Sequence, residues 1–177
     1  MNEPNWSFPH TQDFISHFSQ LLRAIDPTRP TCVGVAGAEE LSRVDNTTTA
    51  LSFHSYDGAG GGAGLATTMR SVAARASSLN KAFLLTEAMS RPADPLLSVL
   101  SAVWGCFDPP PQKRGMGFFL WELMLGVDQF NSDWEAPFQG LLFPNGTWRY
   151  GSEEEAFASF LRTPPSSPPP CAPPSRA

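Results

Sequence analysis

Apolar residues recur along the chain with two different spacings, which predicts alternating helices and strands. Between Thr11 and Ile25 they fall three and four positions apart, as on one face of an α-helix, and Asp26-Pro27 ends this segment. Short uninterrupted apolar runs predict strands that are covered on both faces. The expected helical segments are 11–25, 37–43, 65–79, 95–106 and 153–161, and the expected strands are 31–37, 51–56, 81–87 and 115–122.

The repeated order of strand and then helix predicts an α/β fold with a parallel sheet, because parallel neighbours need a long crossover connection. Two stretches fall outside this pattern. The glycine-rich residues 57–64 lack the Gly-Lys-Ser/Thr ending of a phosphate loop, so we expect a plain loop there. Residues 163–177 are rich in Pro and have nothing large to bury, which predicts a disordered tail after a domain spanning 1–162.

Composition narrows the classes of partner. The chain has 177 residues and a net charge of -5, and its longest basic cluster is the pair Lys113-Arg114, so we expect no nucleic-acid partner. No apolar stretch approaches the roughly 20 residues of a membrane helix. Three cysteines without a Cys-x-x-Cys pair indicate neither a disulfide framework nor a zinc site, and we expect no metal and no cofactor. The start, Met1-Asn-Glu-Pro-Asn, does not resemble a signal sequence and leaves the localisation open.

Polar residues that can do chemistry follow the ends of the predicted strands. In a β/α barrel, the carboxyl ends of the strands carry the active site. The residues at these ends are Asn2 and Glu3 in the opening Asn-Glu-Pro, His54 and Tyr56 in His-Ser-Tyr, Glu87 after Leu-Leu-Thr, and Trp121 before a further Glu.

This set of side chains suits the cleavage of a glycosidic bond. One carboxylic acid protonates the leaving oxygen, and a second carboxylate attacks the anomeric carbon from about 5–5.5 Å away in retaining enzymes. A Trp face covers the apolar side of a sugar ring, while amide and imidazole groups bind its hydroxyls.

The ordered motifs resemble the carboxyl half of a clan A glycoside hydrolase, with family 5, the cellulase-like family, as the closest fit over about residues 1–160. The resemblance implies that Glu3 is the acid/base and that Glu87 is the nucleophile. It further implies an O-glycosyl hydrolase that acts with retention on a β-linked glycoside or polysaccharide, in the manner of a cellulase or mannanase.

The same resemblance assigns the substrate-binding residues. Asn2 would lie beside the reacting sugar, His54 and Tyr56 would orient the nucleophile, and Trp121 would be a sugar platform. Read without the family, His54 is equally a core histidine, and a plain core residue is the alternative reading of Trp121.

The implied fold is the C-terminal part of a (β/α)8 TIM barrel, from about strand four or five to strand eight. A whole barrel takes about 250 residues, so we expect an incomplete barrel whose activity alone is in question. Two alternatives stay open beside the enzyme. One is a non-catalytic carbohydrate-binding or interaction fragment, and the other is a barrel completed by a partner chain.

Overall fold

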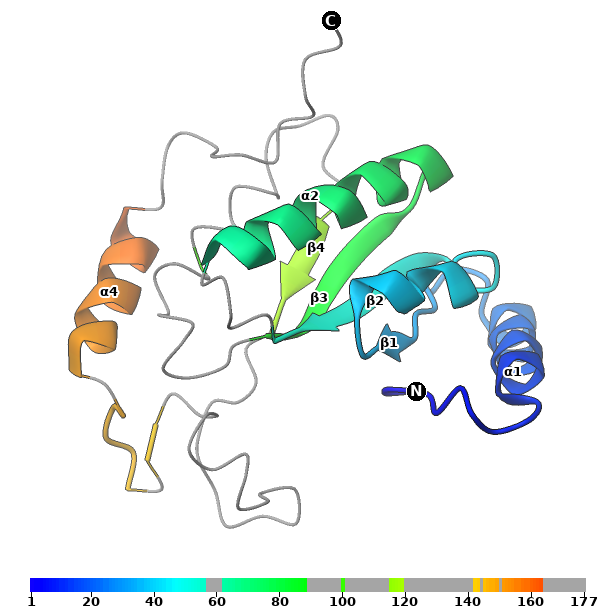
Figure 1. Ribbon diagram of the computed structural model, residues 1–177, viewed down its shortest axis with the longest axis horizontal. Coiled ribbons are helices and arrows are strands. Elements are labelled where there is room, and N and C mark those ends of the chain that lie inside the picture. Colours follow the sequence, from blue (N-terminus) through cyan, green and yellow to red (C-terminus); the bar gives the residue numbers. More distant parts are fainter. Residues whose placement is uncertain are drawn as a thin grey trace, which may run out of the picture.

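The computed structural model places one parallel sheet at the centre of the described chain (Figure 1). It describes residues 1–56, 62–88, 100, 115–119, 142–143, 145–149 and 151–163. Within these residues the sheet has four strands, and they lie side by side in their order along the chain. The strands are β1 (Gly34–Val35), β2 (Ala50–Ser55), β3 (Ala82–Ala88) and β4 (Gly115–Phe118).

Strand order and direction confirm the expected α/β class and are compatible with part of a TIM-barrel-like fold. Every neighbouring pair is parallel, and consecutive strands pair with each other as they do in a β/α barrel. Asn2 extends the series to the start of the chain, because it forms an isolated parallel bridge with Gly34. The four described strands form an open sheet, and the predicted incomplete barrel stays a prediction.

The helices of the described residues follow the predicted pattern closely. They are α1 (Thr11–Ile25), the 3-10 helix η1 (Ala38–Arg43), α2 (Gly62–Leu79) and α4 (Gly151–Arg162). The predicted bounds of α1 are confirmed at both ends. Most of its apolar stripe is nevertheless exposed, since Ile15 is buried while Phe14, Phe18 and Ile25 are exposed.

The start of α2 corrects the expected loop over 57–64. The helix begins at Gly62, so the last three residues of that stretch are helical, and residues 57–61 lie outside the described ones. Glycine costs most in a helix interior. In the first turn the backbone N–H groups have no intrahelical partner in any case, so Gly62 and Gly64 are tolerated there.

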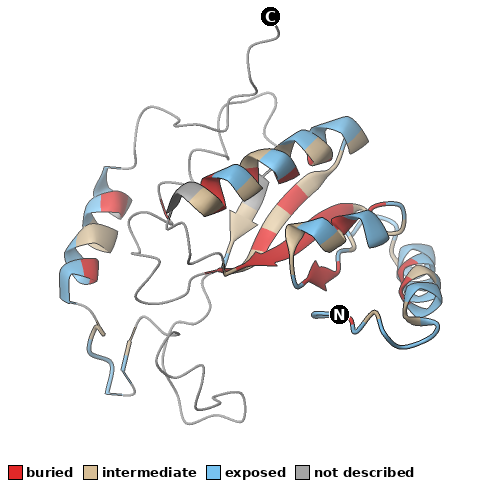
Figure 2. Ribbon diagram, in the orientation of Figure 1, coloured by how far each residue is buried: buried red, intermediate tan, exposed pale blue. Residues whose placement is uncertain are grey.

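The core lies between α2 and one face of the sheet (Figure 2). All six residues of β2 are buried. Successive side chains along β2 and β3 point alternately to this face and to the opposite face of the sheet. The face toward α2 carries Leu51, Phe53, Phe83 and Leu85, and α2 contributes Leu65, Met69, Val72 and Ala76 to the same cluster.

A register shift decides what the opposite face of the sheet presents. Phe53 is paired with Leu85, but the next residue, His54, is paired with Glu87, so Thr86 is an extra residue on β3. Without this bulge, strict alternation would turn the Glu87 side chain toward the core face. The bulge instead keeps Glu87 on the face of His54.

Several predictions fall on residues that the structure does not describe. They are the helix over 95–106 except Leu100, the end of the strand over 115–122 and the Pro-rich tail after Thr163, so the domain boundary stays a prediction. In the described part of the chain, none of the helices combines the length and the apolarity that a membrane crossing needs.

Candidate active site

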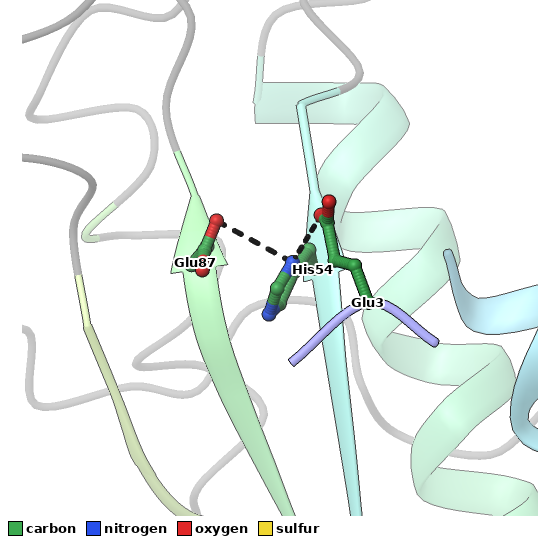
Figure 3. Close-up of side chains that lie close together, drawn as sticks. All are labelled: Glu3, His54 and Glu87. Atoms are coloured by element: carbon green, nitrogen blue, oxygen red, sulfur yellow. Dashed lines mark hydrogen bonds and ion pairs between the residues drawn. The ribbon is translucent and has the colours of Figure 1, made fainter. Parts of the chain in front are cut away.

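Three ionisable side chains from distant parts of the chain meet at the carboxyl end of the sheet (Figure 3). Glu3 comes from the N-terminal segment, His54 from the end of β2, and Glu87 from the end of β3. The His54 Nδ1 atom lies 2.6 Å from Glu3 Oε1 and 3.4 Å from Glu87 Oε2. One imidazole nitrogen therefore lies between two carboxylates.

Two further side chains hold the Glu87 carboxylate. The Asn2 amide Nδ2 donates to Glu87 Oε1 at 3.2 Å, and the Tyr56 hydroxyl donates to Glu87 Oε2 at 2.7 Å. The Glu87 side chain is 15% exposed, so it reaches the surface without being free in solvent. Donors on both oxygens fix the plane of the carboxylate, which is what a nucleophile needs in order to face one carbon atom.

His54 is a buried residue with its polar edge turned to the site. Its side chain is 0% exposed. The 2.6 Å contact between Nδ1 and Glu3 Oε1 is a hydrogen bond that carries one proton, donated by the imidazole when Glu3 is a carboxylate and by Glu3 when it is a carboxylic acid. Among the described residues, the other ring nitrogen, Nε2, has no hydrogen-bond partner.

Glu3 is the more exposed carboxylate, and its backbone is held firmly. Its side chain is 45% exposed, and its backbone N–H donates to the Gly34 carbonyl at 2.7 Å. Its φ of 41° lies in the left-handed region, which costs a residue with a side chain roughly 1–2 kcal/mol. Strain of this kind persists where surrounding contacts fix the backbone, and it concentrates at functional sites.

The distance between the carboxylates is informative about chemistry. One oxygen of Glu3, one oxygen of Glu87 and a ring nitrogen of His54 all lie within 4.8 Å of one another. Retaining glycosidases hold their carboxyl groups about 5–5.5 Å apart, whereas inverting enzymes need about 6.5–9.5 Å to admit a water molecule. The separation is shorter than the one inverting enzymes need.

Among the described residues, Glu3, His54 and Glu87 are the group whose side chains could ligate a divalent cation. Two ligand atoms of a tetrahedral zinc site lie about 3.3 Å apart. Glu3 Oε1 and His54 Nδ1 are closer than that, at 2.6 Å, which is the separation of a hydrogen-bonded pair. The geometry therefore fits a proton between these residues better than a metal ion.

The structure brings together five of the six predicted site residues. Asn2, Glu3, His54, Tyr56 and Glu87 form one connected set of contacts. The sixth, Trp121, lies outside the described residues.

Three small residues of the same face were not predicted. Ser52 Oγ and Thr86 Oγ1 are 2.8 Å apart, and Gly34 lies against Asn2 and His54. Ser52 precedes His54 by two positions, so strand alternation signals that it shares the face. The places of Thr86 and Gly34 depend on register and on close approach between strands, which the sequence pattern does not reveal.

Comparison with known proteins supports the fold class alone. No protein-family model and no curated protein matches the chain. Among solved structures, the chain is similar to a GH2 beta-galacturonidase from Eisenbergiella tayi bound to galacturonate, with a TM-score of 0.65 and 15% identity. The likeness covers 92% of this chain and 32% of that one, so the chain spans about a third of its structural neighbour. The likeness concerns the fold, and it gives no support to family 5 or clan A in particular.

Proposed function

We propose that the protein is an O-glycosyl hydrolase that cleaves a β-linked glycoside with retention of configuration. The observation that carries the proposal is the pair of carboxylates, Glu3 and Glu87, held within 4.8 Å around one imidazole nitrogen. The glycosidase-like fold supports it independently, because the structural neighbour is a glycosidase.

In the first step, Glu87 is the nucleophile. Its carboxylate oxygen forms a bond to the anomeric carbon while the bond to the leaving oxygen breaks, and the Glu3 carboxylic acid gives its proton to that oxygen. Asn2 and Tyr56 hold Glu87 in line for the attack. The product is a glycosyl ester on Glu87 and a free alcohol.

In the second step, Glu3 acts as a base. Its carboxylate removes a proton from water, the hydroxide oxygen bonds to the anomeric carbon, and the ester bond to Glu87 breaks. His54 contacts both carboxylates and so fixes the distance between them. Two displacements on one carbon give net retention.

The finer assignment follows the sequence resemblance. We propose a substrate of the cellulose or mannan type and a sugar-stacking role for Trp121, because an aromatic face covers the apolar side of a pyranose. The structural neighbour, by contrast, is a beta-galacturonidase bound to galacturonate. A panel of aryl β-glucoside, β-mannoside and β-galacturonide therefore separates the two substrate classes directly.

The test traps the nucleophile. We expect a 2-deoxy-2-fluoro glycoside with a good leaving group to label the peptide that contains Glu87, detected by mass spectrometry. Glu87→Gln should abolish both labelling and hydrolysis, while Glu154→Gln, which changes an exposed carboxylate on α4, should leave both intact. Label on another residue, or hydrolysis that survives Glu87→Gln, would contradict the assignment.

A second experiment separates the acid/base from a binding role. In Glu3→Ala, added azide should restore turnover of an activated aryl glycoside and give a glycosyl azide with the same configuration as the substrate. Binding of oligosaccharide to the unaltered protein without any turnover would instead favour the non-catalytic alternative.

A further inference from the structure

Gly34 is joined to the N-terminal segment of the candidate site by two backbone hydrogen bonds. Its N–H donates to the Met1 carbonyl at 3.1 Å, and its carbonyl accepts from the Glu3 N–H at 2.7 Å. Asn2 lies between these two contacts as the bridge partner of Gly34. The strand residue that fixes the backbone of Asn2 and Glu3 is thus a glycine.

A side chain on Gly34 would enter space that neighbouring side chains already fill. A Cβ atom on Gly34 would lie 3.0 Å from Asn2 Oδ1, 3.0 Å from His54 Nε2 and 3.5 Å from Thr86 Oγ1, whereas ordinary contacts of a Cβ are 3.4 Å or longer. Asn2 and His54 would both have to move. His54 is fully buried and already in hydrogen-bond contact with Glu3 on its other nitrogen, so its ring has little room to retreat.

Backbone conformation does not explain this glycine. Among the described glycines, the left-handed region is occupied by Gly146, and Gly34 is an ordinary extended strand residue. Glycine within a strand weakens it, and its usual justification is a bulge or a close approach. Here the close approach is that of the Asn2 amide and the His54 imidazole.

We propose that Gly34 is a positioning residue of the site. The space above its Cα sets where the His54 ring and the Asn2 amide lie, and through them the distance between the two carboxylates. Figure 3 shows His54 between those two carboxylates. The kinetic side of this inference rests on the proposed function. The structural side does not, because the position of the His54 ring can be measured in a protein without any activity.

The test is Gly34→Ala, with Gly117→Ala as the matched control. Gly117 is a strand residue of the same sheet, and a Cβ there would meet its nearest neighbour, Leu84, at an ordinary 4.0 Å. The His54 ring nitrogens are followed by NMR, in which the exposed His10 and His17 serve as internal references. We expect Gly34→Ala to shift the His54 signals alone, and Gly117→Ala to shift none of the three.

The kinetic result should match the spectroscopic one. A displacement of a few tenths of an ångström in the groups that orient a nucleophile should lower kcat about tenfold with little change in KM, and should alter the pH profile. If the protein proves inactive, the proposed function fails while the NMR result still decides the role of Gly34. His54 signals that are unchanged in Gly34→Ala, or equally changed in Gly117→Ala, would overturn the inference.

A second variant covers the case in which Gly34→Ala does not fold. Adding Asn2→Gly removes one of the two closest contacts of the new Cβ, and we expect this double variant to fold with shifted His54 signals. Failure of both variants to fold would overturn the inference, since Gly34 would then serve the sheet and not the site.

Discussion

The two ends of β2 and β3 carry charged clusters that are built in opposite ways. At the amino end, Lys81 Nζ donates to the backbone carbonyls of Asp45 and Thr48, and Arg75 pairs with the Asp45 carboxylate. Each charge there meets the opposite charge or a carbonyl dipole. At the carboxyl end, the carboxylates of Glu3 and Glu87 face one imidazole.

Under the proposed function, this difference separates a stabilising cluster from a catalytic one. Matched charges at the amino end tie the segments before β2 and β3 to α2. The two carboxyl groups at the carboxyl end lie within 4.8 Å of each other around one imidazole and have no Lys or Arg partner among the ion pairs of the described residues. Carboxyl groups placed in this way are the groups that acid/base chemistry uses.

The largest effect on activity is expected from a substitution of Glu87 at the carboxyl end of β3. Glu87→Gln keeps the size of the side chain and removes the nucleophile, so hydrolysis of an aryl β-glycoside should fall by roughly 10⁴-fold or more. The midpoint of urea unfolding should move little, because Gln fills the same space and keeps one oxygen that can accept a hydrogen bond from Asn2 or Tyr56. A large loss of stability together with activity would instead make this cluster structural.

The reverse pattern is expected at the amino end. Asp45 is 7% exposed, and Asp45→Asn removes the charge that pairs with Arg75. Weakening a charged hydrogen bond that is partly buried should lower the free energy of unfolding by about 1.5–3 kcal/mol. Urea denaturation measures this loss, and kcat/KM of the folded variant should stay at the level of the unaltered protein. A fall in kcat/KM would link the two ends and undo the distinction.

The sequence predicted elements better than it predicted contacts. The bounds of α1 were predictable because apolar periodicity and Asp26-Pro27 are local signals. The strand expected over 31–37 shrinks to Gly34–Val35, because the Thr31 carbonyl accepts from the N–H groups of Thr49 and Ala50 outside the regular ladder. Such pairing depends on a distant segment, which no local pattern reports.

The same limit applies to the site. That Glu3, His54 and Glu87 would meet was predicted from their positions at the carboxyl ends of parallel segments, although β1 lies between the segment of Glu3 and β2. That Glu87 faces His54 depends on the extra residue Thr86, and strict alternation from Leu85 would have turned it away. The register shift is a property of two strands together, so it appears only in the folded chain.

A smaller effect on activity is expected from a substitution of Tyr56, and it tests whether this residue orients Glu87. Tyr56→Phe removes the 2.7 Å hydrogen bond to Glu87 Oε2 and leaves the ring in place. A single hydrogen bond to a charged group corresponds to about a tenfold loss in kcat/KM. The loss should lie mainly in kcat, measured from full rate curves, because the bond orients the nucleophile. A change confined to KM would mean that Tyr56 binds the sugar and does not orient Glu87.

The smallest expected effect concerns pH and the amino end. Burial lowers the pKa of Lys81 below its usual 10.5, the nearby Asp45 opposes that shift, and Arg23 adds to it. The unfolded chain therefore binds this proton more tightly than the folded one. Between the lowered pKa and 10.5 the unfolded state holds more protons, so this group makes stability rise with pH across that window.

Lys81→Met removes the titrating group and its two hydrogen bonds, so the variant should be less stable than the unaltered protein at every pH. The difference in unfolding free energy between the two should widen as pH rises toward 10.5, because the penalty of burying the charged amine fades only in the unaltered protein. Urea titrations from neutral pH to 10.5 measure this difference, in which the other titrating groups cancel. A difference that narrows with rising pH would mean that the charge on Lys81 stabilises the fold. The attraction of Asp45 would then outweigh the cost of burying the charged amine.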